Sequence, residues 1–283
     1  MEDRVWYHCL SSFWIKVLAL FLMTLDHVAK FMIFYEVAPE TANVLQIVGR
    51  LGFPLFILMI AEGVRHTHNF GKYILRLSIL GVAVLLGQII IHYCFMDIYG
   101  FYSPIIDLIL VALTLYFVKQ WNKKSFLALI PVFIIVLSFV VNAIEIRDNI
   151  EIWWFPFYLR SGYNIYALLL GLCFYFAPML TKLIIRNFGN GVENLEGTHF
   201  ERLVINAVMI FGLFLATLII YLLALLPGGD VYDIAIQSYS GCAAGIIFFY
   251  SGKLGYNKKW FKYGSYVYFP LHIAIIFVIF QLI

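Results

Sequence analysis

A stretch near the start of the chain is long and apolar enough to cross a bilayer, yet it carries three ionisable side chains near its middle. The stretch is residues 15–35, IKVLALFLMTLDHVAKFMIFY, and the three residues are Asp26, His27 and Lys30. A charged side chain at the centre of a bilayer costs about 2.5–3.5 kcal/mol on insertion scales, so a helix that only anchors a protein uses apolar residues there. The cluster therefore predicts a buried polar site inside a membrane protein.

Composition supports this interpretation. Hydrophobic residues make up 63% of the 283 residues, charged residues make up 12%, and the mean hydropathy is +0.92. A soluble domain carries about 25% charged residues, so this chain has too few to cover a surface that faces water. We expect an all-α polytopic bundle of transmembrane helices in which residues 1–283 form a single domain. The four cysteines form no CxxC pair and have no histidine at metal spacing, so we expect no metal.

A hydropathy profile with a window of about 20 residues predicts about nine spans. They lie at roughly 15–35, 44–63, 73–95, 102–118, 126–144, 163–185, 203–226, 234–252 and 263–283. Most of the 19 lysines and arginines fall in alternate connections, and acidic residues populate the others. Because cytoplasmic loops carry the excess of positive charge, this pattern places the N-terminus in the cytoplasm and the C-terminus outside.

The connection at residues 145–162, EIRDNIEIWWFPFYLRSG, falls on the outer side in this topology. Its mixture of charged and aromatic residues is typical of a segment that lies at the level of the lipid headgroups. The pattern favours an interfacial anchor. The alternative is a cap that binds an acceptor.

Within the first span, Lys16 and His27 are placed on one face of the helix. They are eleven residues apart, which puts them within about 20° of each other around the axis and roughly 16 Å apart along it. A lysine at the membrane edge can hold a phosphate, so the pair suits an elongated ligand with an anionic head and a reactive tail, such as a coenzyme A ester. The alternative is a lysine that snorkels to the interface and a histidine that only packs. Asp26 and Lys30, at i and i+4, are predicted to form an ion pair.

The second span and the loop that follows it carry further basic residues. Arg50 enters the outer end of GRLGFPLFILMIAEG, in which Pro54 is expected to loosen the first turns of the helix. The next loop brings Arg65, Lys72 and Arg76. One interpretation is that these residues only reflect the excess of positive charge in cytoplasmic loops. The other is that they bind the phosphates of a nucleotide-like donor.

Three more histidines are candidates for a polar site. In the last span, KYGSYVYFPLHIAIIFVIF, His272 lies at a depth close to that of His27, and a second histidine inside the membrane is costly unless it faces a polar interior. His66 and His68 have no carboxylate or cysteine at ligand spacing. We therefore expect a solvated loop or an anion contact there in preference to a metal.

At these residues the chain resembles a known family. The runs IKVLALFLMTLDHVAKF, GRLGFPLFILMIAEGVRHTHNFGKYILRL and YVYFPLHIAIIF look like the TraX family, named for the conjugative-transfer protein that acetylates the N-terminus of pilin. TraX proteins in turn resemble a wider superfamily of integral-membrane acyltransferases, many of which place ten residues between a basic residue and a histidine in the first helix. Lys16 and His27 stand in that arrangement. The resemblance implies that His27 is catalytic and that Lys16 binds the donor.

Together these features predict a multi-pass acyltransferase of the prokaryotic plasma (inner) membrane that takes acetyl-CoA, or a near relative, from the cytoplasm. His27 is expected to act as the general base on an amine or hydroxyl. The other catalytic candidates are Asp26 and His272, and the positioning candidates are Lys30 and Arg50. The residues expected to bind the donor's phosphates are Lys16, Arg65, Lys72 and Arg76.

The acceptor is left open between a peptide N-terminus, a glycan and a small molecule. Apart from the donor, the acceptor and membrane lipid, no partner is indicated, and we expect no nucleic acid. A proton-coupled transporter is the main rival, with Asp26, His27, Lys30 and His272 as its relay. A non-catalytic assembly factor, with these polar groups joining helices, is the third hypothesis.

Overall fold

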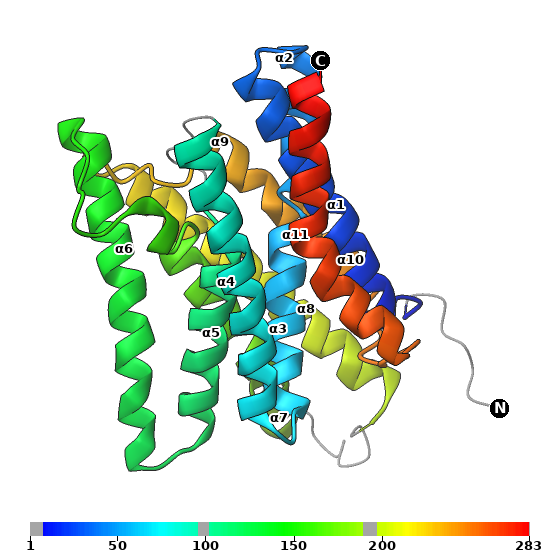
Figure 1. Cartoon of the computed structure of the whole chain (residues 1–283). Helices are drawn as coiled ribbons and strands as arrows, with labels where there is room; N and C mark the ends of the chain where they lie inside the picture. Colours follow the sequence, from blue (N-terminus) through cyan, green and yellow to red (C-terminus); the bar gives the residue numbers. More distant parts are fainter. Residues whose placement is uncertain (1–7, 96–101, 189–196, 283) are drawn as a thin grey trace.

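The computed structural model describes residues 8–95, 102–188 and 197–282, which form a bundle of helices without a β-sheet (Figure 1). The helices lie at α1 (Ser12–Phe34), α2 (Pro39–Gly49), α3 (Gly52–His66), α4 (Phe70–Cys94), α5 (Pro104–Lys119), α6 (Leu129–Asp148), α7 (Asn164–Phe188), α8 (His199–Ala224), α9 (Ile234–Gln237), α10 (Ala243–Phe248) and α11 (Lys259–Leu282). Short 3-10 turns lie at Lys123–Ala128, Phe157–Leu159 and Ser238–Cys242. The predicted all-α membrane bundle is confirmed.

Each of the nine predicted spans has a helical counterpart in the described residues. Seven segments are long and apolar enough to cross a membrane, with α2 and α3 counted together. The fourth predicted span corresponds to α5, which has 16 residues, and the eighth is divided among α9, a 3-10 turn and α10. The span count of nine and the orientation of the termini stay predictions.

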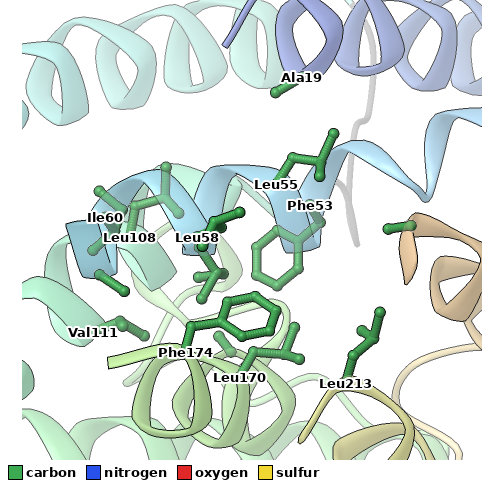
Figure 2. Packing of buried hydrophobic residues seen from close by; sticks show 14 of the residues in the cluster. Ala19, Phe53, Leu55, Leu58, Ile60, Leu108, Val111, Leu170, Phe174 and Leu213 are labelled. Carbon is green, nitrogen blue, oxygen red and sulfur yellow. The ribbon is translucent and has the colours of Figure 1, made fainter. Parts of the chain in front are cut away.

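Helix α3 occupies the centre of the bundle. It packs against α1, α5 and α7, and its buried side chains reach in several directions because residues 52–61 carry no polar side chain. Leu55 points toward Ala19 of α1, whereas Leu58 points toward Leu170 and Phe174 of α7 (Figure 2). This core fixes α1, which carries the polar cluster, against the rest of the protein.

At the end of α2 the backbone of Gly49 lies directly against Asp26 of α1. A Cβ atom at Gly49 would lie 2.6–2.7 Å from the backbone and Cβ of Asp26, so only glycine allows α2 to approach α1 this closely. Arg50 and Leu51 then separate α2 from α3. Pro54, in the first turn of α3, provides no N–H group, and the break between α2 and α3 lies just before it. The loosening of the first turns of this span stays a prediction.

Replacing Gly49 with valine is expected to destabilise the protein by about 1–3 kcal/mol or more, because the added atoms meet backbone that cannot move aside. The measurement is the thermal unfolding midpoint of the purified protein in detergent. Gly87→Val on α4 is the matched control, since nothing lies within 4 Å of a Cβ atom built there. Equal midpoints for the two variants would show that the contact at Asp26 does not hold the helices together.

The segment at residues 145–162 is held together by one buried arginine. Arg160 is fully buried and pairs with the carboxylate of Glu145, and its Nη2 also donates to the carbonyl of Ile152 at 2.9 Å. Trp153 and Trp154 are exposed, as an interfacial anchor requires. The segment is therefore a folded connection whose tryptophans face outward.

Candidate functional site

The site is built between α1 and α11, which lie side by side (Figure 1). Lys16 has its ammonium 5.7 Å from the ring centre of Phe261 and 5.9 Å from that of Tyr266, both on α11. His27, further along α1, faces His272 of α11, with ring centres 5.0 Å apart. The predicted common face of Lys16 and His27 is thus the face toward α11.

The two histidines are held in a defined orientation by their own helices. His27 Nδ1 lies 2.8 Å from the Met23 carbonyl and His272 Nδ1 lies 2.9 Å from the Tyr268 carbonyl, so each Nδ1 carries the hydrogen and donates it. His272 Nε2 is 3.4 Å from His27 Nδ1. In this tautomer, assigned from the hydrogen bonds, His27 Nε2 carries the lone pair and is able to accept a proton.

A chain of charged groups lies beside His27. Asp26 pairs with Lys30 at 3.0 Å, which confirms the predicted ion pair, and its other oxygen lies 3.6 Å from Arg50. Arg50 in turn donates to the hydroxyl of Tyr163 at 3.0 Å. The two cations hold the Asp26 carboxylate in place, which positions the stretch of α1 that carries His27.

Asp107 extends this chain, although sequence reasoning did not single it out as a site residue. Its carboxylate is fully buried and accepts hydrogen bonds from the Ser161 hydroxyl and from the backbone N–H groups of Gly162, Tyr163 and Asn164. These N–H groups open α7, so Asp107 caps that helix from another part of the chain. The cap sets the position of Tyr163, the partner of Arg50.

A cavity of about 700 Å³, called here the large cavity, opens at the end of the bundle where α1 and α11 begin. Four cations line it: Lys16, Arg76, Lys258 and Lys262, called here the basic rim. None of the four has a carboxylate partner among the described residues, and Arg76 Nε is buried without a hydrogen bond there. Glu62 also lines the cavity, but it is already paired with Arg65 and His66, each at 3.1 Å. The rim is therefore suited to an anion.

Two basic residues grouped with Lys16 and Arg76 lie outside the large cavity. Lys72 is exposed at the start of α4, and only its backbone N–H is bound, by Asn69. Arg65 donates from Nη2 to the carbonyls of Phe174 and Tyr175 in α7, at 2.8 and 2.9 Å. Pro178 has no N–H to offer the Phe174 carbonyl four residues earlier, so Arg65 supplies the missing donor and joins α3 to α7.

Lys258 and Lys262 of the basic rim were not predicted as ligand residues, although their position at the start of a helix is unusual for lysines. They fall with Lys259 around the first turn of α11, where the positive end of the helix dipole disfavours cations. Helix stability therefore does not explain why these lysines lie at that end. His66 and His68 line the same cavity and belong to its polar opening.

The large cavity does not include His27. It ends at Phe56, Leu108 and Phe269, called here the wall, and its inner part is apolar. On the other side of the wall, two small cavities of about 50 and 30 Å³ are both lined by His27, Lys30 and Phe269. The basic rim and His27 therefore face the two sides of the wall.

The chain matches a family model described as TraX protein over residues 11–187. It is also similar to a protein of Dichelobacter nodosus described as "Probable fimbrial assembly protein FimC, serogroup H1", with 39% identity over 72 residues. That match covers 25% of this chain and 29% of the relative's own length. No solved structure matches the chain.

Proposed function

Because the chain belongs to the TraX protein family, we propose that it is a membrane-embedded acyltransferase that moves an acetyl or short acyl group from acyl-CoA to an amine or hydroxyl. The observation that carries the proposal is the large cavity, with cations at its opening that have no carboxylate partner among the described residues and an apolar inner end that the wall separates from His27. Acyl-CoA has the matching form, since its phosphates and its thioester lie at opposite ends of a thin arm. The family is named for a protein that acetylates pilin, so acetyl transfer is the first reaction to test.

In the proposed complex the phosphates of acyl-CoA contact the basic rim from the cytoplasm, and the pantetheine arm follows the large cavity to the wall. Lys16 and Arg76 bind the phosphates by charge-assisted hydrogen bonds. The cavity is large enough for a ligand of this size, since ligand pockets of about 300–1,000 Å³ are typical. Lys258 and Lys262 complete the charge at the opening.

The reaction itself follows from the orientation of His27. Its Nε2 takes the proton from the acceptor N–H or O–H while the acceptor attacks the thioester carbonyl carbon. The C–S bond of the resulting tetrahedral intermediate then breaks, and the leaving CoA thiolate receives the proton from His27. Asp26 and Arg50 position α1, and His272, which contacts His27 directly, keeps the ring in place.

The acceptor would be an amine or hydroxyl that reaches the small cavities beside His27. The Dichelobacter relative is described as a fimbrial assembly protein, so a subunit of a surface fibre is the first acceptor class to assay. The proposed location is the prokaryotic inner membrane.

Removing the cations of the basic rim tests the donor site. Lys16→Ala and Arg76→Ala are each expected to weaken binding of acetyl-CoA about 10- to 100-fold, since a hydrogen bond to a charged group contributes about 1.5–3 kcal/mol. Binding is measured by titrating acetyl-CoA and following the thermal unfolding midpoint in detergent. Lys72→Ala is the matched control and should bind as the wild type does, because Lys72 lies outside the large cavity.

Three results would contradict the proposal. If the wild-type protein does not bind acetyl-CoA, the proposed donor site is wrong. Proton-coupled flux in liposomes without an acyl donor would support a transporter. If Lys72→Ala weakened binding as much as Lys16→Ala, the effect would be one of overall charge and not of a site.

A further inference from the structure

Phe269 lies at the junction of the three cavities. Its side chain lines the large cavity and both of the small cavities beside His27. It is almost fully buried, with its ring 6.0 Å from that of His272 and 6.2 Å from that of Phe56, in edge-to-face contact with both. A group that moves from the large cavity to His27 has to cross the wall, and Phe269 is the wall residue that lines all three cavities.

The backbone around Phe269 favours a local adjustment. Pro270 follows it directly and has no N–H group, so the carbonyl of Tyr266 loses its helical hydrogen bond. Helices bend most readily at such a proline. The aromatic ring thus stands where α11 is least constrained by its own hydrogen bonds.

The space on the two sides of the wall is unequal. The large cavity is about 700 Å³, whereas the small cavities are about 50 and 30 Å³. A water molecule needs about 10–15 Å³ of cavity volume of this kind, so the space beside His27 accommodates a group of only a few heavy atoms. An acetyl group fits such a space, and a long acyl chain does not.

We propose that Phe269 is a specificity-determining residue that limits transfer to acetyl and other short acyl groups by restricting the passage between the large cavity and His27. This inference rests on the proposed function, because it concerns the same acyl-CoA. The ring also keeps water in the large cavity away from His27, which limits hydrolysis of the thioester in the absence of an acceptor.

The test compares the wild type with Phe269→Ala, using acetyl-, butyryl-, hexanoyl- and octanoyl-CoA. We expect the wild type to favour acetyl-CoA over hexanoyl-CoA by at least tenfold in the release of free CoA. Phe269→Ala should reduce that preference at least tenfold and should raise the acceptor-free hydrolysis of acetyl-CoA. Phe269→Leu should lie between the two, and it retains most of the buried volume if the alanine variant does not fold.

Phe277→Ala is the matched control. Phe277 is on the same helix, with its ring 6.4 Å from that of Phe31, and it lines none of the three cavities. It should keep the wild-type preference. If folded Phe269→Ala and Phe269→Leu also keep that preference and the low hydrolysis rate, this inference is overturned while the proposed function stands. If no variant and no wild-type sample binds or consumes any acyl-CoA, the proposed function itself has failed.

Discussion

His27→Gln is expected to lower acyl transfer by a factor of about 10²–10⁴, the usual contribution of a general base, while the protein stays folded. Glutamine is polar and of similar size, but it cannot accept a proton at neutral pH as the Nε2 atom of His27 does. Binding of acetyl-CoA should change little, because His27 lies beyond the wall from the large cavity. The expected result is thus a protein that binds the donor and does not consume it.

The measurement is the release of CoA, quantified by chromatography. A thiol dye is unsuitable because Cys9, Cys94 and Cys242 are exposed. His199→Gln is the control, since His199 lies at the start of α8, outside all three cavities. A folded His27→Gln variant with wild-type turnover would exclude His27 as the base.

The largest loss of stability is expected from Arg160→Met. Arg160 is fully buried and holds the segment at residues 145–162 through Glu145 and two backbone carbonyls, those of Ile152 and Phe155. Removing one partner of a buried ion pair costs about 3–5 kcal/mol, because the other charge is left buried and unpaired. We therefore expect a fall in the thermal unfolding midpoint far larger than that of an average surface substitution.

A second substitution separates the ion pair from the loss of volume. Glu145→Gln placed in the Arg160→Met background should recover part of the stability, because it removes the unpaired buried charge. Arg147→Met is the matched control, since Arg147 pairs with Asp148 in the same segment but is exposed to solvent. The account of this segment is wrong if Arg160→Met and Arg147→Met unfold at the same temperature.

The features that the sequence predicts well depend on the geometry of a single helix. The i, i+4 spacing of Asp26 and Lys30 predicts their ion pair, and the eleven-residue spacing of Lys16 and His27 predicts their common face. The depth of His272 also follows from its distance to the end of an apolar span. Each of these inferences needs only the helical repeat and the width of a bilayer.

The features that the sequence does not predict depend on contacts between distant helices. The basic residues near Arg65 in the sequence suggest that it binds phosphate. In the structure it donates a hydrogen bond to the Phe174 carbonyl of α7, which lacks its helical donor because Pro178 has no N–H group. Pro178 lies more than a hundred residues further along the chain. Nothing in the sequence around Asp107 indicates that it caps α7, which begins more than fifty residues later. The wall formed by Phe56, Leu108 and Phe269 brings together three helices, and no local pattern marks it.

The most direct test of the central claim is photolabelling of the purified protein with an acyl-CoA analogue that carries a diazirine at its acyl end, followed by mapping of the labelled residues. The account predicts labelling of Phe56, Leu108, Phe269 or their immediate neighbours, and loss of this labelling when acetyl-CoA is added in excess. Labelling that excess acetyl-CoA does not reduce, or labelling confined to exposed residues of α4 such as Leu75 and Ile79, would contradict it.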